Sequence, residues 1–349
     1  MELDAIVSAV KAAHDNRRPL RIRGGGSKDF YGGMLAGEVL DCSGHRGIIE
    51  YEPTELFIRA RGGTPLAEIE LALAERGQGL PFEPPLFGRA TLGGGVAAGL
   101  SGPRRQQAGA VRDFVLGVTL VDGTGQTLMF GGQVMTNVAG YDVSRLMAGS
   151  LGTLGVLTEV TLKVLPRPVA ERTLVFELDE ASAIARLNAW GGQPLPVSAS
   201  FWHAGRLWLR LSGAAAAVDA ATTRLGGAEA ADAEAFWDSV REQTHPAFAG
   251  ELLWRLALPT RTPPLGLCGL RAIEWGGGLR WYAAEAADPR GAASGAGGHA
   301  VLYRAPESQR LLTGTFAPLP APLLALHRRL KEVFDPRRIL NPGRLYAEF

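Results

Sequence analysis

Residues 24–28 form the first stretch of the sequence whose composition suggests ligand chemistry. Three glycines are followed here by serine and lysine, directly after an alternating stretch at 20–23 that predicts a short strand. Consecutive glycines can adopt positive φ and aim neighbouring N–H groups into one concavity, which binds phosphate oxygens without a cationic side chain. The pyrophosphate of a dinucleotide would suit such a loop. For one glycine run taken alone, a mobile surface turn is the alternative.

Three more glycine-bearing segments follow in the first half of the chain. They comprise residues 90–99, 101–113 and 140–158. A single glycine loop is commonly a plain turn. Four such segments, each at an expected junction between elements, indicate a long ligand that lies against exposed backbone.

One of these segments imitates a Rossmann fingerprint. Residues 93–98 match Gly-x-Gly-x-x-Gly/Ala, and Asp113 stands twenty residues after the first glycine. The preceding residues 84–91 do not read as a buried strand, however, and Asp113 begins a strand pattern instead of ending one. The regular strand–helix alternation of a Rossmann domain is also missing. We therefore disfavour that fold.

The elements that must position these segments form a β–β–α unit, a hairpin and a long strand. We expect helices at 3–18 and 65–77 (the second capped by Thr64), a helical turn at 141–148, and strands at 20–23, 48–51, 56–61, 114–121, 126–130 and 156–165. Residues 81–110 show little regular pattern. The Pro-Arg-Pro sequence at 166–168 marks a boundary.

The chain beyond this boundary has a different texture. We expect strands at 174–178, 197–203, 206–211, 251–258, 269–275, 279–284 and 299–304, helices at 181–190, 214–225 and 322–334, and a loose loop at 286–298. The order resembles two halves of a ferredoxin-like antiparallel sheet. We predict an α+β fold with domains at 1–168 and 169–315, and a C-terminal helix and tail at 316–349 that returns to the first domain.

The composition excludes several classes of function. The 349 residues are 46% hydrophobic and 20% charged with a formal net charge of +1, which suits a globular protein and argues against a nucleic-acid-coating surface. Two distant cysteines, Cys42 and Cys268, cannot form a four-cysteine cluster, and the six histidines show no metal-binding spacing. Neither a signal peptide nor a membrane span is visible. We expect a cytoplasmic protein, with peripheral attachment to the inner membrane through partners as an alternative.

Taken together, the motifs resemble those of the FAD-binding flavoproteins of the vanillyl-alcohol-oxidase (PCMH) type. The matching motifs are Arg-Gly-Gly-Gly-Ser at 23–27, Ala-Thr-Leu-Gly-Gly at 90–94, Val-Arg-Asp-Phe-Val-Leu-Gly at 111–117, the glycine-rich run at 149–158 and the tail at 334–343. Residues 80–85, 101–105 and 132–145 are most similar to the FAD-binding (E) subunits of bacterial glycolate oxidases. The resemblance covers nearly the whole chain and implies a two-subdomain PCMH-type domain followed by a small ferredoxin-like cap.

The resemblance also implies the cofactor contacts. Expected at the pyrophosphate are Arg23, Gly24, Gly25, Gly26, Ser27, Lys28, Thr91, Gly93 and Gly94, with Pro84 nearby; along the ribityl chain and flavin, Ser101, Gly102, Gly109 and Asp113; at the adenine–ribose end, Gly149, Gly152, Gly155, Val156 and Leu157. A plain turn is the alternative for each glycine, and a solvated charge for Arg23. Some relatives tether flavin through a histidine in the first loop. Because Ser27 and Lys28 stand there, FAD should be non-covalent.

The implied function is that of a subunit of a multi-subunit glycolate (2-hydroxy acid) oxidase or dehydrogenase. A sister FAD-containing subunit would perform catalysis and an iron–sulfur subunit would carry electrons onward. The alternatives are a self-sufficient FAD-linked oxidoreductase of a small hydroxy acid or alcohol, and a flavin-fold scaffold without catalysis. No catalytic residue emerges, although cap arginines such as Arg255 could face the flavin. Thr136 replaces the basic residue usual in the E-subunit pattern.

Overall fold

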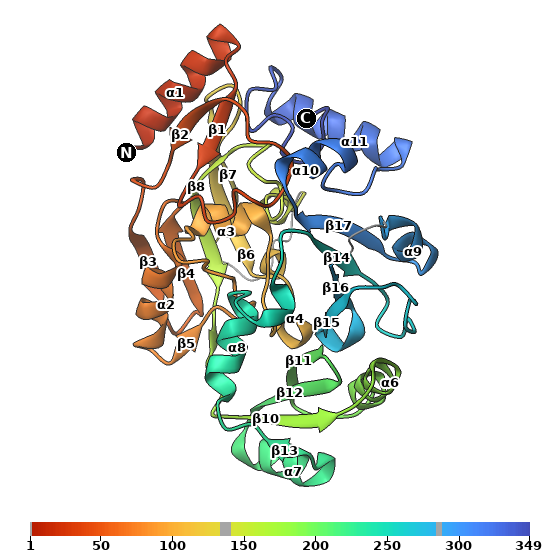
Figure 1. Cartoon of the computed structure of the whole chain (residues 1–349). Coiled ribbons are helices and arrows are strands. Elements are labelled where there is room, and N and C mark those ends of the chain that lie inside the picture. Colours follow the sequence, from red (N-terminus) through yellow and green to blue (C-terminus); the bar gives the residue numbers. More distant parts are fainter. Residues whose placement is uncertain (1, 133–140, 284–287) are drawn as a thin grey trace.

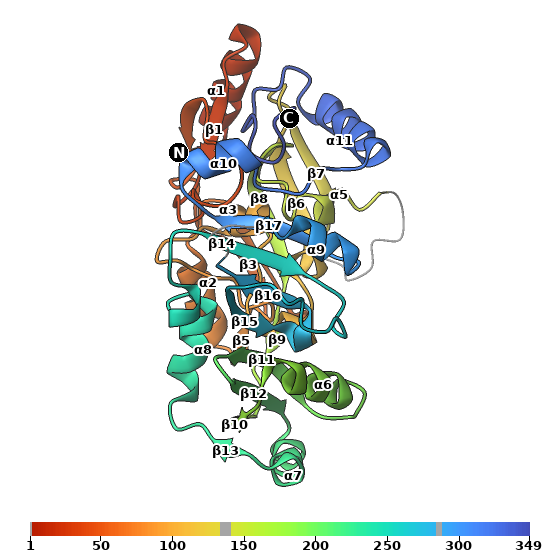
Figure 2. The ribbon, with the colours of Figure 1, turned by 45° about the vertical axis from the view of Figure 1, so that its right-hand side comes forward.

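Two antiparallel sheets organise the computed structural model, which describes residues 2–132, 141–283 and 288–349 (Figure 1). The five-stranded sheet has the order β3-β4-β8-β6-β7, and the eight-stranded sheet has the order β13-β10-β12-β11-β15-β16-β14-β17. Two-stranded pairs, β1-β2 and β5-β9, flank them. In both views α1 and α11 lie at one end of the molecule, and α7 lies at the other (Figures 1 and 2).

The bounds of the elements are as follows. Up to the boundary they are α1 (Leu3–Asn16), β1 (Leu20–Arg23), β2 (Glu38–Asp41), β3 (Ile48–Glu52), β4 (Phe57–Arg61), α2 (Leu66–Ala74), β5 (Gln78–Gly79), α3 (Leu92–Ala98), α4 (Arg105–Ala108), β6 (Val115–Val121), β7 (Thr127–Gly131), α5 (Val143–Leu146), β8 (Val156–Lys163) and β9 (Leu165–Pro166). Beyond it they are β10 (Ala170–Glu177), α6 (Glu180–Gly191), β11 (Val197–His203), β12 (Arg206–Gly213), α7 (Ala215–Leu225), β13 (Ala228–Glu229), α8 (Ala233–Arg241), β14 (Leu253–Ala257), β15 (Leu270–Glu274), β16 (Leu279–Tyr282), α9 (Arg290–Gly295), β17 (His299–Arg304), α10 (Glu307–Thr313) and α11 (Ala321–Phe334).

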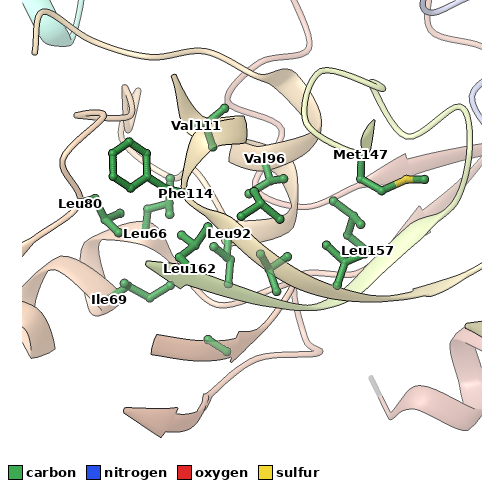
Figure 3. Close-up of a cluster of buried hydrophobic side chains, with 14 of the residues drawn as sticks. Leu66, Ile69, Leu80, Leu92, Val96, Val111, Phe114, Met147, Leu157 and Leu162 are labelled. Atoms are coloured by element: carbon green, nitrogen blue, oxygen red, sulfur yellow. The ribbon is translucent and has the colours of Figure 1, made fainter. Parts of the chain in front are cut away.

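The helices α2 and α3 cover the five-stranded sheet. Figure 3 shows Ile69 of α2 and Val96 of α3 pointing into the same cluster as Leu162 of β8. Because β8 is the central strand, both of its faces are buried apart from two positions. The alternating residue pattern at 156–165 therefore does not mark one solvent-exposed face and one buried face of the strand.

The helix α3 was not expected from the sequence, since three of its seven residues are glycine, which disfavours helix. It forms because Leu92 and Val96 are buried in the sheet's core cluster. The Thr91 hydroxyl accepts a hydrogen bond from the N–H of Gly94 and caps the first turn. Burial and capping thus outweigh the low propensity.

The eight-stranded sheet lies in the part of the chain that was predicted to form the cap, and it is called the cap below. Its strands β10, β12 and β11 pack against α6 and α7 through a cluster that includes Leu187, Leu209 and Val218. Another cluster joins cap residues to Leu100 and Leu151 of the first part of the chain. The eight-stranded sheet is thus packed against the first part of the chain rather than tethered loosely to it.

Two expectations about local structure are wrong, and two helices were missed. The segment 286–298 is not a loop throughout, because α9 lies within it. The helices α8 and α10 were not predicted. Thr64 does not cap α2: its hydroxyl accepts a hydrogen bond from the N–H of Gly47 (2.9 Å), and Pro65 is the N-cap residue. No helix in the part of the chain that the structure describes is long and apolar enough to cross a membrane.

Candidate cofactor-binding site

A cleft opens where β1 ends and α3 begins. Its walls come from the loop after β1, the first turn of α3, the segment that enters β8, and the C-terminal tail. The lining residues are Ile22, Arg23, Gly24, Gly25, Gly26, Ser27, Lys28, Asp29, Leu35, Cys42, Gly62, Thr91, Gly93, Gly94, Ala97, Ala98, Leu151, Gly152, Gly155, Val156, Leu157, Asn341 and Arg344. The cleft combines a polar loop with apolar walls, as small-molecule and cofactor sites do.

Five consecutive N–H groups in the loop after β1 are available to a ligand. Within the described residues, none of the backbone N–H groups of residues 24–28 donates a hydrogen bond. A row of free donors in a glycine loop that lines a cleft can serve as an anion-binding nest. The glycine run predicted such a loop, and its contact with a pyrophosphate stays a prediction.

The first two glycines of the loop are required by the protein itself. A Cβ atom at Gly25 would lie 1.7 Å from the carbonyl oxygen of Arg89, and one at Gly24 would lie 2.2 Å from Oγ1 of Thr91. Only Gly26 has a positive φ, of 70°. The loop is therefore pressed against the segment that leads into α3, and glycine is needed for this internal contact.

Lys28 closes one side of the loop. Its Nζ donates hydrogen bonds to the carbonyl oxygen of Pro85 (3.0 Å) and to Oγ of Ser27 (3.3 Å), and it lies 5.1 Å from the centre of the Phe87 ring. Burial lowers the pKa of Lys28 to about 8, although Glu242 acts in the opposite direction. The lysine is therefore a cation at neutral pH that loses its charge readily.

Arg23 is paired rather than solvated. Its Nε lies 3.3 Å from Oδ2 of Asp29, and Nη2 of Arg21 lies 2.6 Å from the same oxygen. Two cations share one carboxylate here, so the loop region keeps a positive excess that favours an anionic ligand.

The C-terminal tail completes the cleft. The buried guanidinium of Arg344 donates hydrogen bonds to several carbonyl oxygens of the segment 28–33, among them Tyr31 and Gly33. Burial lowers the pKa of Arg344 to about 10, with Asp29 acting in the opposite direction. Deeper in the tail, Nζ of Lys331 donates to Oδ2 of Asp335 (2.7 Å) and to the carbonyl oxygen of Thr153 (2.8 Å). The C-terminal segment therefore contacts two walls of the cleft, the segment 28–33 through Arg344 and the segment that enters β8 through Lys331.

Thirteen of the sequence-predicted residues line this cleft together. They are Arg23, Gly24, Gly25, Gly26, Ser27, Lys28, Thr91, Gly93, Gly94, Gly152, Gly155, Val156 and Leu157. The N–H of Gly93 is already taken by the carbonyl oxygen of Gly62 (2.8 Å), and that of Gly94 points to Thr91. At the start of α3 a ligand could therefore approach the backbone closely, but the N–H groups of Gly93 and Gly94 are not free to bind it.

The other six predicted residues, Pro84, Ser101, Gly102, Gly109, Asp113 and Gly149, lie outside the cleft. Ser101 and Gly102 line a separate small cavity beside the cap. Asp113 accepts a hydrogen bond from the N–H of Ala110 (2.9 Å), and the N–H of Gly149 donates to Val96. The carbonyl oxygen of Pro84 accepts from Arg241. These contacts shape the chain around the cleft.

Several lining residues were missed by sequence reasoning. Asn341 belongs to the tail motif and Arg344 directly follows it, but that motif indicated the family and not a place in the fold. Leu35, Cys42 and Gly62 carry no local signal at all. Thr136 lies outside the described residues. Across residues 2–132, 141–283 and 288–349, no group of three metal-ligating side chains is assembled.

Two family models match the chain. A model described as an FAD binding domain matches residues 2–145, and one described as the C-terminal domain of FAD linked oxidases matches residues 319–345. The glycolate oxidase subunit GlcE of Escherichia coli (strain K12) is 49% identical over 348 residues, which cover 99% of this chain and 97% of that protein. The chain belongs to the GlcE family. The family that the motifs indicated is thereby confirmed.

Relatives outside the GlcE family align with about half of the chain. The glycolate oxidase subunit GlcD of Bacillus subtilis (strain 168) is 30% identical over 186 residues, covering 52% of this chain and 39% of that protein. The D-lactate dehydrogenase of Anaerostipes hadrus is 32% identical over 180 residues, covering 50% and 37%. A solved alkyldihydroxyacetonephosphate synthase has a TM-score of 0.64 at 16% identity, covering 97% of this chain and 74% of its own, which shows a shared fold. The PCMH-type α+β prediction is confirmed.

The residues of the cleft fit FAD, the cofactor of this family. The row of free N–H groups at 24–28 suits a pyrophosphate, and the positive excess around Asp29 suits its charge. The apolar wall formed by Ile22, Val156 and Leu157 suits an aromatic ring system.

Proposed function

We propose that this chain is the FAD-binding subunit of a multi-subunit glycolate (2-hydroxy acid) oxidase or dehydrogenase. The similarity to GlcE over nearly the whole of both chains supports this assignment, as do the related GlcD and D-lactate dehydrogenase sequences. The observation that carries FAD binding is the row of five unpaired N–H groups at 24–28 facing the cleft. In this proposal residues 1–168 bind FAD, 169–315 form the cap, and 316–349 close the cleft.

The proposed contacts place the FAD pyrophosphate on the loop 24–28 and the adenine–ribose end along the segment 152–157. Ser101, Gly102, Gly109 and Asp113 remain proposed neighbours of the flavin end. FAD binds non-covalently in this proposal. Cys42 supplies the thiol of the cleft, and burial raises its pKa to about 12, so it stays protonated and a poor nucleophile.

Catalysis is proposed to belong to a sister FAD-containing subunit, and onward electron transfer to an iron–sulfur subunit. The chain's own two cysteines are too few for a cluster, which supports this division. The bound FAD of this chain would then carry electrons or stabilise the fold. We place the complex in the cytoplasm, with any attachment to the inner membrane made through partner subunits.

Purification with anaerobic titration tests the proposal. The chain should be yellow, release its FAD on denaturation, keep its absorbance when glycolate is added alone, and bleach when the sister subunit is added. Bleaching by glycolate without a partner would instead establish a self-sufficient oxidoreductase. A colourless protein that takes up no FAD would establish a scaffold.

A further inference from the structure

The helix α11 leaves a row of apolar side chains exposed. We call this row the α11 seam, and it consists of Leu323, Leu326, Leu330 and Val333. The exposed fraction is 47% for Leu323, 51% for Leu326 and 72% for Val333, and Leu330 is partly exposed. The helix lies at the edge of the molecule in both views (Figures 1 and 2). None of the four side chains lines the cofactor cleft.

The spacing of the seam is that of a helix which packs against another helix. Its steps of three, four and three residues are those of the a and d positions of a heptad, and they keep the four side chains within about 80° of the helix circumference. An amphipathic helix that packs onto its own protein usually has a broader apolar stripe, and the narrow one is typical of a coiled-coil contact.

A different face of α11 already attaches the helix to its own protein. The ring of His327 stacks on that of Phe349, with 5.9 Å between the ring centres, and Phe334 packs against Phe130 at 6.2 Å. Phe334 and Lys331 are buried on this face. The seam is therefore not needed to hold the helix in place.

The charge beside the seam is positive. Arg329 comes three residues after Leu326 and four before Val333, so it lies next to both on the helix surface. Arg329 is exposed, and in the part of the chain that the structure describes it forms no ion pair. Arg328, on the opposite side of the helix, pairs with Glu348 at 3.4 Å. A partner that covers the seam would therefore gain from a carboxylate beside Arg329.

A second copy of this chain does not fit the seam well. Glu332 is the one acidic residue in α11, and it pairs with Arg338 at 3.9 Å. Two copies of the helix would thus bring only like charges to the contact. Four side chains are also far fewer than the roughly 20 residues that each partner contributes to a stable interface. The seam therefore suits a partner that is held at other places as well.

A membrane surface fits the seam less well than a helix does. Helices that lie on membranes present a broad apolar face, usually with aromatic residues at the boundary. The seam is narrow and contains only leucine and valine. Its width and its single flanking charge both favour a protein partner.

We propose that the α11 seam binds an amphipathic helix of the sister FAD-containing subunit, and that a carboxylate beside the apolar positions of that helix pairs with Arg329. The inference rests on the proposed function, which supplies the sister subunit and the further contacts of a complex. It assigns the partner to a particular face of this chain, away from the cofactor cleft.

Affinity measurements between the purified flavin-loaded chain and the purified sister subunit test the seam. We expect Leu326→Gln to weaken binding about tenfold and Arg329→Gln about threefold to tenfold, the latter mostly at low salt. Arg328→Gln makes the same change on the opposite side of the same helix and should bind like the parent chain. Leu312→Gln, at a leucine of α10 that is 82% exposed, is the apolar control and should also bind normally.

The possible outcomes separate this inference from the proposed function. Equal binding by the parent chain, Leu326→Gln and Arg329→Gln would overturn the seam and leave the proposed function standing, whereas no binding by the parent chain would count against both. Self-association of the parent chain that Leu326→Gln abolishes would assign the seam to a second copy. Sedimentation with vesicles of anionic phospholipid, lost in the same variant, would assign it to a membrane. Flavin absorbance should stay unchanged in all four variants and shows that each is folded.

Discussion

Oδ1 of Asn341 accepts a hydrogen bond from the backbone N–H of Ile22 at 2.7 Å, across 319 positions of the chain. The same side chain donates from Nδ2 to the carbonyl oxygen of Leu151, also at 2.7 Å. Ile22 belongs to the strand that delivers the glycine loop, and Leu151 belongs to the opposite wall of the cleft. One amide therefore links two walls of the cofactor cleft.

Replacing Asn341 by alanine should weaken both the fold and FAD retention. The change removes two largely buried hydrogen bonds and puts alanine at a φ of 42°, which asparagine tolerates better. We expect a loss of about 2–4 kcal/mol in the free energy of unfolding and a lower flavin content. Denaturant titration and the ratio of flavin to protein absorbance measure the two effects. Asn188→Ala, which removes amide hydrogen bonds within the cap, should retain FAD.

The fold was predictable where its signals are local. The strand 20–23, the hairpin around residues 122–125 and the strands 197–203 and 299–304 all follow from alternation and turn residues. The helix α3 was not, because its stability comes from burying Leu92 and Val96 against a sheet whose strands are distant in sequence. Helix propensity alone predicts a loop here, because three of the seven residues are glycine.

The site was predictable in part for a similar reason. Free N–H groups follow from consecutive glycines, so the loop 24–28 could be identified from the sequence. The contact of Asn341 with Ile22 and that of Arg344 with Asp29 each span more than three hundred positions, and no local pattern encodes them. The reason for glycine also differs from expectation, since Gly25 is confined by the Arg89 carbonyl group rather than by ligand space alone.

Gly25→Ala should therefore be enough to abolish FAD binding. A Cβ atom would stand 1.7 Å from the backbone oxygen of Arg89, which cannot yield as a flexible side chain would, so the loop must move and its N–H groups lose their alignment. Fluorimetric FAD titration of the apoprotein measures the loss. Gly191→Ala is the matched control, because nothing lies within 4 Å of a Cβ atom there. Full flavin content in Gly25→Ala would refute the assignment of the loop.

FAD affinity should fall as pH rises through about 8. Burial lowers the pKa of Lys28 to about 8, so the ammonium group beside the cleft is charged below that pH and neutral above it. A bound pyrophosphate favours the charged form, which makes binding tighter below pH 8. Lys28→Met should bind FAD about tenfold more weakly at pH 7 and lose this pH dependence. Lys11→Met, in α1, is the control and should keep the pH dependence of FAD affinity. If Lys28→Met keeps it as well, Lys28 does not have the proposed role.

Neutralising Glu83 should lower the free energy of unfolding more than neutralising an exposed carboxylate does. The reason is that Glu83 joins the cap to the FAD-type domain. Both its oxygens lie 2.9 Å from Nη2 of Arg210 in β12, and Oε2 accepts from the N–H of Arg104 at 2.7 Å. Burial acts to raise the pKa of Glu83, but Arg210 and Arg104 outweigh it and hold the pKa below the ordinary value. The carboxylate is therefore charged in the folded protein across the neutral range.

Glu83→Gln should lower the free energy of unfolding by about 3–5 kcal/mol at pH 7, since it leaves a buried arginine without its counter-charge. A carboxyl group whose pKa is depressed by folding stabilises the protein above its unfolded pKa, and this contribution disappears as pH falls through the folded pKa. The penalty of the variant should therefore shrink in acid. Denaturant titrations at pH 7 and at about pH 4 measure it. Glu177→Gln breaks an exposed pair with Arg206 and should cost less than about 1 kcal/mol, so an equal cost for both variants would show that Glu83 does not join the two parts.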